Sequence, residues 1–590
     1  MRTLPIAGLA LLASLVCVPA VHSGEPAALR ADGTDAGVRP VGALHAGRSV
    51  AMAMHGMAAT SHALASQVAV DVLKKGGSAV DAAIAANAML AFAEPFMCGP
   101  GGDLFAIVWD PATRKLHGLN GSGRAARAMD LATLRQRLGP DARAMPPVGP
   151  LVVTVPGAVD AWFALHARFG KLPIAEVLGP AIAYAREGVP TPPVIALGWQ
   201  QSTDYLIGEI RDAALLANLR ETFMPGGRNP AVGEVFRNAR YADFLERLAR
   251  EGRDYVYRGE AGQRIVAAVQ GAGGVLSAED LAAHRSDWVE PVHTDYRGYH
   301  VHQLPPNGQG TAVLQMLNIL RGYDLRAMGR ANPDFWHLML EAKKLAYEDR
   351  GRFYADPDYM RMPLATLLSE EHAASRRALI RMDRALQSVP VTPLPNDDGD
   401  TVYLAVADGS GMMFSLIQST YDGFGSGIVP EGLGFALQNR GAAFSLDPAH
   451  PNAYAPGKRP FHTIIPGFVT KDGEPLIAFG LMGGSMQAQG HAQVLVNLID
   501  FDMDLQDAGD AARFRHDGST EPGAEMNTGG EVILEPGVPP EVLAELGRRG
   551  HRVKLAREDY GGYEAVMRDP VSSVLTGATE MRKDGAAIGY

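Results

Sequence analysis

Residues 396–419 read NDDGDTVYLAVADGSGMMFSLIQS and combine a loop with a β-hairpin. Residues 401–407 follow the two-residue alternation of a strand and are rich in β-branched and aromatic side chains. The tetrapeptide DGSG favours a turn, and residues 412–419 return as a second strand. The first strand begins at Thr401, directly after three acidic residues and a glycine. The hairpin therefore places a hydroxyl at the junction between a loop and a sheet.

The register of this hairpin can be counted from its turn. Centring the turn on Gly409 and Ser410 pairs Thr401 with Gln418 and leaves Ser419 adjacent. A β-bulge would shift the pairing by one residue. The sequence predicts a second side chain close to Thr401 and leaves open whether it is Gln418 or Ser419.

The loop before Thr401 suggests a self-cleaving nucleophile. Residues 385–400 consist largely of Pro, Asp and Gly and predict a linker or exposed loop. If the chain is cut between Asp400 and Thr401, Thr401 gains an α-amine whose pKa of about 8 suits a general base. Its hydroxyl would then be the nucleophile, and one residue would supply both groups. The competing interpretation is a threonine that only starts a strand.

Composition limits the classes of protein to which the chain can belong. It has 590 residues, 47% of them hydrophobic and 20% charged, which predicts one large domain or several domains with packed cores. The net charge is −11 and no long basic stretch occurs, so a nucleic-acid surface is not expected.

The N-terminus resembles an export signal. Residues 1–23 contain a positive start, an apolar run and small residues before a cleavage site, and residues 24–50 predict a leader or linker. A retained membrane anchor is the alternative, but the run is short and no second hydrophobic segment follows, so we expect no membrane span in the mature chain. Cys98 would then be the one cysteine left, which excludes an internal disulfide and a cysteine zinc site.

Helix signals occur on both sides of the hairpin. Residues 61–93 predict two helices interrupted by a glycine pair, with a capping box formed by Ser78 and Asp81. Asn332 and Pro333 predict the start of a helix over residues 333–352. Because strands and helices mix throughout, the class is α/β or α+β.

A second glycine motif follows a predicted strand near the C-terminus. The strand EPLIAFG leads to Gly483 and Gly484, and a helix is expected to begin near Ser485. Paired glycines at such a junction allow backbone N–H groups to converge as an oxyanion hole. A tight strand-to-helix turn without chemistry is the alternative. Neither a nucleophile elbow, nor a phosphate-binding lysine loop, nor HExxH occurs.

Taken together, these stretches resemble the γ-glutamyltransferase (γ-glutamyltranspeptidase) family of N-terminal nucleophile hydrolases. The resemblance covers nearly the whole chain after residue 50. It rests on the ordered set GGSAVDAAIAANAML, CGPGGDLF, VPGAVDAW, LSAEDLAAH, DYRGYHVHQLPP, HLMLEAKKLAYEDRGRFYADP, GDTVYLAV, GKRPFHTIIP and GLMGGS.

The resemblance implies an α+β fold, a four-layer αββα sandwich. It also implies cleavage between Asp400 and Thr401 into a large subunit (51–400) and a small subunit (401–590) that form a heterodimer. Thr401 would be the nucleophile and Ser419 a supporting hydroxyl, with the oxyanion hole at the two glycines described above. No cofactor or metal is implied. The expected localisation is secreted or periplasmic.

The substrate clamp departs from the family's usual pattern. Glutathione-cleaving members carry an arginine near the position of Asn120, and Arg124 lies four residues further on. They also carry an acid, which holds an α-ammonium, where this chain has Ala443. The altered clamp indicates that recognition of an α-amine is lost.

Arg440 adds a guanidinium fork suited to a carboxylate, or it is a structural arginine paired with Asp422 or Asp447. The family's serine pair is replaced here by His462 and Thr463. The residues expected to bind substrate are Asn120, Tyr421, Asn439, Arg440, His462 and Thr463.

Three classes of function follow from these observations. The first is an autoprocessed amidohydrolase or acyltransferase acting on γ-glutamyl or related acidic amides, including glutathione. Within this first class, the alternative is an acidic-amide hydrolase without α-amine recognition. Such an enzyme would resemble glutaryl-cephalosporin acylases or oxamate amidohydrolase. The second is a non-catalytic exported binding protein on the same scaffold. A metallohydrolase is the third, and the scattered histidines give it little support.

Overall fold

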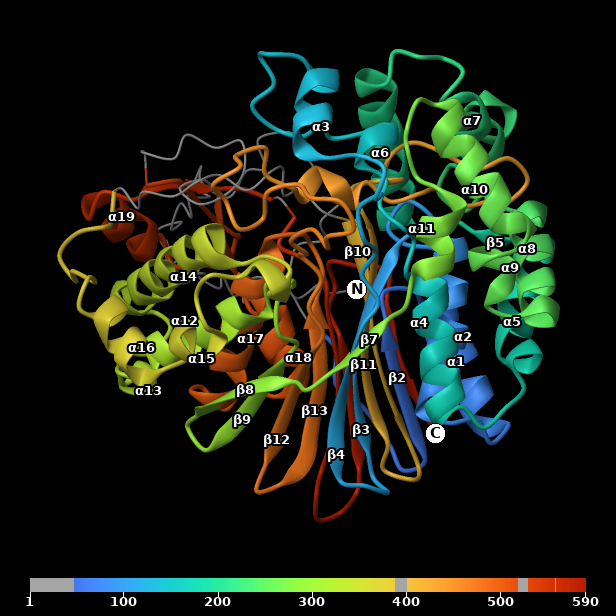
Figure 1. Cartoon of the computed structure of the whole chain (residues 1–590). Coiled ribbons are helices and arrows are strands. Elements are labelled where there is room, and N and C mark those ends of the chain that lie inside the picture. The colour runs from blue at the N-terminus through green and yellow to red at the C-terminus, as the bar shows by residue number, and fades with distance from the viewer. Residues whose placement is uncertain (1–46, 388–399, 518–528, 558) are drawn as a thin grey trace, which may run out of the picture.

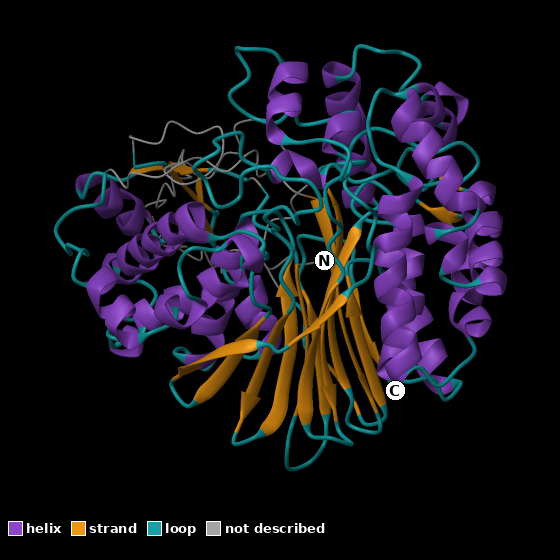
Figure 2. Ribbon diagram, viewed as in Figure 1, coloured by secondary structure: helices purple, strands orange, loops and turns teal. Residues whose placement is uncertain are grey.

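The computed structural model describes residues 47–387, 400–517, 529–557 and 559–590. Two seven-stranded sheets lie face to face, and helices cover the outer face of each (Figures 1 and 2). The expected four-layer αββα sandwich is therefore confirmed. The predicted signal (1–23) and most of the predicted leader lie outside the described residues. Among the helices of the described part, none is long and apolar enough to cross a membrane.

The first sheet contains the predicted hairpin at its centre. All of its neighbouring strands pair antiparallel. Their order is β19 (Ala586–Gly589), β2 (Gly56–Thr60), β10 (Asp400–Asp408), β11 (Met413–Tyr421), β3 (Asp103–Asp110), β4 (Lys115–Asn120) and β7 (Asp287–Val289).

The second sheet carries the strand that precedes the glycine pair. Its pairs are also antiparallel. Its order is β1 (Ala51–Ala53), β18 (Leu575–Thr579), β17 (Tyr563–Arg568), β13 (Glu474–Leu481), β12 (Gly467–Lys471), β9 (Tyr299–Gln303) and β8 (Val292–Tyr296).

Smaller strands lie outside these two sheets. A three-stranded sheet consists of β14 (Phe514–Asp517), β15 (Glu531–Leu534) and β16 (Arg552–Leu555), and a two-stranded one of β5 (Val189–Pro190) and β6 (Val235–Phe236).

The helices on the β10 side come mainly from the first half of the chain (Figure 1). They include α1 (Ala63–Lys74), α2 (Ala79–Ala93), α4 (Ala158–Phe169), α5 (Ile174–Glu187), α6 (Pro193–Glu209), α7 (Ala217–Phe223), α8 (Ala239–Glu251), α9 (Asp254–Tyr257), α10 (Glu260–Gly271) and α11 (Ala278–Ala283); α3 (Leu131–Leu138) lies nearby.

The other outer layer packs on the β13 sheet. Its helices are α12 (Gly310–Leu320), α13 (Leu325–Met328), α14 (Pro333–Phe353), α15 (Leu364–Leu367), α16 (Glu370–Arg377), α17 (Met486–Ile499), α18 (Leu505–Asp510) and α19 (Pro540–Arg548).

Strand β10 is apolar on both faces because each face has its own core. Leu404 and Val406 belong to the core between this sheet and the helices that cover it. Tyr403 and Ala405 belong to the core between the two sheets, where they meet residues such as Phe468. Successive side chains of a strand point to opposite faces, so burial on both sides requires an unbroken apolar run.

The predicted helix starts are confirmed. The Ser78 side chain accepts from the Asp81 amide, and the Asp81 carboxylate accepts from the Ser78 amide, so the capping box closes in both directions. Asn332 caps α14, and Pro333 is its first residue. Both signals depend on hydrogen bonds within one helical turn, which the local sequence specifies.

The predicted hairpin exists, but the counted register is wrong by one residue. Val402, not Thr401, pairs with Gln418. The connection is a three-residue loop closed by a bond from the Asp408 amide to the Met412 carbonyl (3.0 Å), with Gly411 at φ 89°. A three-residue loop that ends in a left-handed glycine is a common hairpin connection.

Candidate active site

A β-bulge sits at the start of β10 and positions Thr401. Asp400 pairs with Tyr421 and Val402 with Gln418, so Thr401 faces two residues of β11, one of which is Ser419. Thr401 is buried. The Ser419 hydroxyl donates to the main-chain carbonyl oxygen of Asp400 at 2.5 Å. The structure thus decides between the two candidates in favour of Ser419.

The Ser419 oxygen also receives two hydrogen bonds. The Tyr421 amide donates to it at 2.7 Å and Arg440 Nη2 at 3.3 Å. These two donors polarise the hydroxyl, which itself donates to the Asp400 carbonyl. Tyr421 has φ 85°, a left-handed conformation that is strained for a tyrosine and typical of functional sites.

Arg440 is completely buried at the start of the short 3₁₀ helix η5 (Arg440–Ala443). Its Nη1 donates to the Thr463 hydroxyl at 2.9 Å, and its guanidinium carbon lies 4.1 Å from the centroid of the Tyr421 ring. The stacked ring and the two hydroxyl partners fix the plane of the guanidinium. Arg440 therefore lies directly beside Ser419.

The glycine pair lies between β13 and α17, as predicted. Gly483 and Gly484 have φ of 99° and 51°, which a residue with a side chain adopts only at a cost. The side-chain amide of Gln309 donates to the Gly484 carbonyl (2.9 Å) and to the Thr463 carbonyl (2.7 Å). Arg350 holds Gln309 by donating to its side-chain oxygen at 2.6 Å. Gln309 thus joins the glycine turn to the loop that bonds Arg440.

Gln487 is a site residue that the sequence analysis missed. Its Nε2 donates to the Thr401 hydroxyl oxygen at 3.3 Å. Its Oε1 accepts from the Ile465 amide at 3.0 Å, which fixes which end of the amide faces Thr401. Gln487 lies in the first turn of α17, three residues after Gly484. Its position just after the glycine pair was the sequence signal that could have identified it.

His462 forms a buried pair with Asp103. Its Nε2 donates to Asp103 Oδ2 at 3.1 Å, and its Nδ1 accepts from the Ile464 amide. Burial and the charge of Arg440 lower the pKa of His462 well below its ordinary value, so the ring is neutral at pH 7. Burial raises the pKa of Asp103 to about 6, although Arg440 opposes this change.

A sequence model of the family described as gamma-glutamyltranspeptidase matches residues 65–590. The chain belongs to the γ-glutamyltranspeptidase family. It is therefore an amide-bond hydrolase or acyltransferase of that family. The predicted resemblance is confirmed.

Three relatives illustrate the breadth of the γ-glutamyltranspeptidase family. The glutathione hydrolase-like YwrD proenzyme of Bacillus subtilis (strain 168) is 34% identical over 543 residues, covering 90% of this chain and 98% of that protein. The acylase ACY 1 proenzyme of Pseudomonas sp. (strain SE83) is 35% identical over 539 residues, covering 90% and 93%. The crystal structure of cephalosporin acylase from Bacillus halodurans is 44% identical with a TM-score of 0.86, covering 92% of this chain and 98% of that one.

Asn120 and Arg124 are two positions at which the sequence is expected to depart from glutathione-cleaving members of the γ-glutamyltranspeptidase family. Asn120 donates to Asn307 at 2.8 Å and accepts from Ser122, so it stabilises its own loop. Arg124 pairs with Asp356 at 3.4 Å. Within the described residues, its hydrogen-bond partners do not include the groups around Ser419.

Asn439 and Ala443 flank Arg440. Asn439 donates to the Asp422 carboxylate and to the Pro147 carbonyl, both at 2.7 Å, which fixes the turn that carries Arg440. Ala443, which the resemblance predicts to replace the α-ammonium-binding acid, is buried and belongs to an apolar cluster. The Ala443 side chain therefore offers no charge to an ammonium group.

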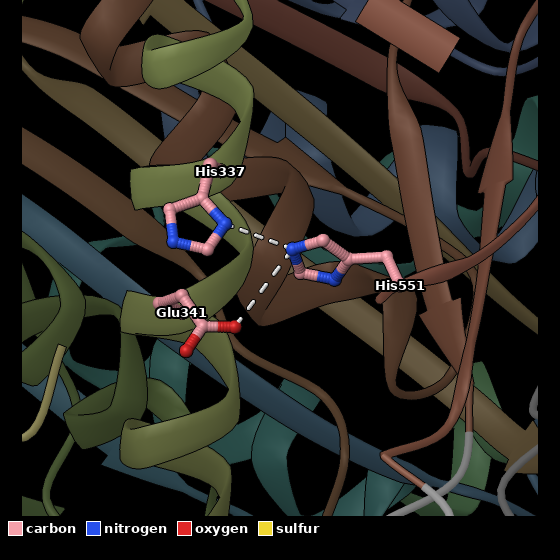
Figure 3. A group of neighbouring side chains, drawn as sticks. All are labelled: His337, Glu341 and His551. Carbon is pink, nitrogen blue, oxygen red and sulfur yellow. Dashed lines mark hydrogen bonds and ion pairs between the residues drawn. The ribbon is translucent and has the colours of Figure 1, made fainter. Parts of the chain in front are cut away.

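A separate group of side chains has the composition of a metal site. His337, Glu341 and His551 are buried and lie close together (Figure 3). His337 Nε2 donates to the Arg381 carbonyl (2.8 Å), so its Nδ1 accepts from His551 Nε2 (2.9 Å). The Lys344 ammonium donates to Glu341 at 2.9 Å and to His551 Nδ1 at 3.4 Å. A cation already bridges this group, and its hydrogen bonds do not involve Thr401.

Proposed function

We propose that this protein is an autoprocessed threonine amidohydrolase, cut between Asp400 and Thr401 into a large subunit (51–400) and a small subunit (401–590) that stay together as a heterodimer. The observation that carries the proposal is the hydrogen bond from the Ser419 hydroxyl to the Asp400 carbonyl, in a bulge that also holds the Thr401 hydroxyl. Relatives named as proenzymes support processing.

Processing begins with attack of the Thr401 hydroxyl oxygen on the Asp400 carbonyl carbon. The C–N bond breaks, the hydroxyl proton ends on the released nitrogen, and Asp400 becomes esterified to Thr401. Ser419 stabilises the negative charge that develops on the Asp400 oxygen, because it already donates to that atom at 2.5 Å. Water then hydrolyses the ester, which restores the Thr401 hydroxyl and separates the two chains, with the Thr401 α-amine already free.

Turnover uses the same hydroxyl on an external amide. The new α-amine acts as general base, Thr401 forms an ester with the substrate acyl group, and water or an amine accepts that group. The amides of Gly483 and Gly484 serve as the oxyanion hole. Gln487 supports the nucleophile by donating to its oxygen, which leaves the hydroxyl hydrogen available to the base.

The substrate is an acidic amide, and Arg440 is its principal recognition group. A buried guanidinium beside Ser419 suits a carboxylate at the far end of the acyl group. The other residues expected to contribute to substrate binding are Tyr421, Thr463, His462, Asn439 and Asn120. The γ-glutamyl group and the glutaryl group both carry such a carboxylate, and only the first carries an α-ammonium.

A specific observation favours acyl groups without an α-ammonium. The apolar, buried Ala443 stands where a charge partner would be needed, and an unpaired buried ammonium is costly. The 44% identity with the protein titled cephalosporin acylase agrees with this preference.

Two measurements test the proposal. The intact mass of wild-type protein should show two fragments split before Thr401, whereas Thr401→Ala should remain a single chain. Initial rates on a glutaryl anilide and a γ-glutamyl anilide should then favour the glutaryl compound. An uncut wild-type chain overturns the processing proposal, and a preference for the γ-glutamyl compound overturns the substrate preference.

The predicted signal at residues 1–23 supports a secreted or periplasmic site of action.

A further inference from the structure

A polar cavity beside α6 is lined in part by Asp400, the residue that precedes Thr401. Its volume is about 130 Å³. Its other charged or hydroxyl side chains are those of Ser61, Glu94, Asp559, Arg582, Lys583 and Asp584. A cavity of this size with several polar partners holds water, because one water needs only about 10–15 Å³ of such volume.

This cavity has a neighbour through which water can reach it. A second cavity of about 360 Å³ is also lined by Asp400 and shares Gly198 and Gln201 with the first. Gln201 and Tyr205, which line the second cavity, are exposed on the surface of α6. Asp400 therefore lies where two water-accessible spaces meet.

Glu94 is the buried carboxyl group of the first cavity. It ends α2, and its Oε1 accepts from the Ser61 hydroxyl at 2.6 Å. The chain after Glu94 packs against the end of β11, because the Phe96 carbonyl accepts from the Thr420 hydroxyl and the Met97 carbonyl from the Thr420 amide. Glu94 is thus held by the same strand end that carries Ser419.

The other carboxylates of this cavity are engaged elsewhere. Asp584 Oδ2 accepts from the amides of Val194 and Ile195 and so caps the N-terminus of α6. Asp559 Oδ1 accepts from the Gly561 amide and lies 4.0 Å from Lys583 Nζ. Asp400 Oδ2 accepts from the Ser202 hydroxyl at 3.4 Å. Among the described residues, the side chain that donates to the Glu94 carboxyl group is the neutral Ser61 hydroxyl, which leaves lone pairs for a water molecule.

We propose that Glu94 is the general base for the water that hydrolyses the Asp400–Thr401 ester during maturation. The inference rests on the proposed processing. Water attacks the Asp400 carbonyl carbon and gives one proton to Glu94. The C–O bond to Thr401 then breaks, and the proton passes from Glu94 to the Thr401 oxygen. Asp400 is released as an α-carboxylic acid, which loses the second proton of the water molecule to solvent. No other reactant is needed.

The electrostatics of the cavity suit this role. Burial raises the pKa of Glu94 to about 7, while the Ser61 hydrogen bond and the Lys583 charge lower it and the charges of Asp584 and Asp400 raise it. A carboxylate with a pKa near the working pH is an effective base. The rate of ester hydrolysis should rise as Glu94 loses its proton, with half its maximum near pH 7.

The test follows maturation of the full-length chain in time, with Glu94→Gln beside the wild type. Gln keeps the size and can still accept from Ser61, but it cannot accept a proton. We expect subunits to appear about 100-fold more slowly. The ester-linked chain should accumulate, and hydroxylamine should split it and leave a hydroxamate on Asp400. Asp559→Asn, which alters another carboxylate of the same cavity, is the matched control and should mature at the wild-type rate.

A second variant keeps the inference testable if Glu94→Gln does not fold. Ser61→Ala removes the bond that lowers the Glu94 pKa, so the pH profile of maturation should shift to higher pH with its plateau retained. Added formate should also speed maturation of Glu94→Ala. An unshifted Ser61→Ala profile, or normal maturation of folded Glu94→Gln, overturns the role of Glu94. A wild-type chain that never matures overturns the proposed processing instead.

Discussion

Ser419 provides the sharpest test of how this chain would cut itself. Ser419→Ala removes the donor that lies 2.5 Å from the Asp400 carbonyl oxygen. Loss of one oxyanion donor costs about 10²–10³ in rate, or about 2.7–4 kcal/mol of transition-state stabilisation. We expect maturation to slow by that factor, because Ser419 donates to the oxygen on which the negative charge develops.

The assay is the fraction of cut chain against time after synthesis in a cell-free system, read by intact mass. Thr420→Val is the matched control. It deletes the next hydroxyl along β11, which is also buried but donates to the Phe96 carbonyl at 3.2 Å instead. We expect this control to mature at a rate within a few-fold of the wild type. Normal maturation of Ser419→Ala, or equal slowing in both variants, would refute the reasoning.

Four further outcomes are expected. Gln487→Ala should lower kcat on an acidic anilide about tenfold through loss of a single hydrogen bond, whereas Gln489→Ala, which changes a helix neighbour bonded to His516, should not. Arg440→Lys keeps the positive charge but loses the two-pronged guanidinium group, so kcat/KM for a glutaryl anilide should fall about 10–100-fold. The control is an anilide with a neutral acyl group, for which kcat/KM should fall less. Burial lowers the pKa of His62 to about 4. The contribution of neutral His62 to the free energy of unfolding is therefore present above pH 6.5 and is lost as the pH falls toward 4. In urea titrations near pH 5, His62→Asn should reduce the pH dependence of the free energy of unfolding by about 1.4 kcal/mol per pH unit. Cys98 is buried and burial raises its pKa, so a thiol reagent should label it only after denaturation.

Local signals predicted the elements of this fold well. Ser78 and Asp81 satisfy each other's amides within one turn, and Asn332 caps the helix that Pro333 begins. The hairpin was predicted for the same reason, because alternation and a glycine turn are properties of neighbouring residues. Its register was not, because a three-residue loop and a bulge replaced the simpler turn, and both depend on how β10 packs between β2 and β11.

The candidate site divides in the same way. Thr401, Ser419 and the glycine pair could be proposed from the sequence because each belongs to a short motif with a recognisable chemistry. Gln309 could not, because an isolated glutamine carries no pattern, whereas Gln487 was missed although it closely follows the glycine pair. Only the packed structure places the Gln309 amide between the Thr463 and Gly484 carbonyls.

The sequence by itself determined where the helices and strands form, which hydroxyl can begin a chain, and which family the chain resembles. The tertiary structure decided that Ser419 rather than Gln418 meets the Asp400 carbonyl, that Arg440 lies beside Ser419, and that Glu94 shares a cavity with Asp400. The physical reason is the separation along the chain between the residues that interact. Caps and turns are made by atoms a few residues apart, whereas Glu94 and Asp400 meet only because two sheets and their helices pack together.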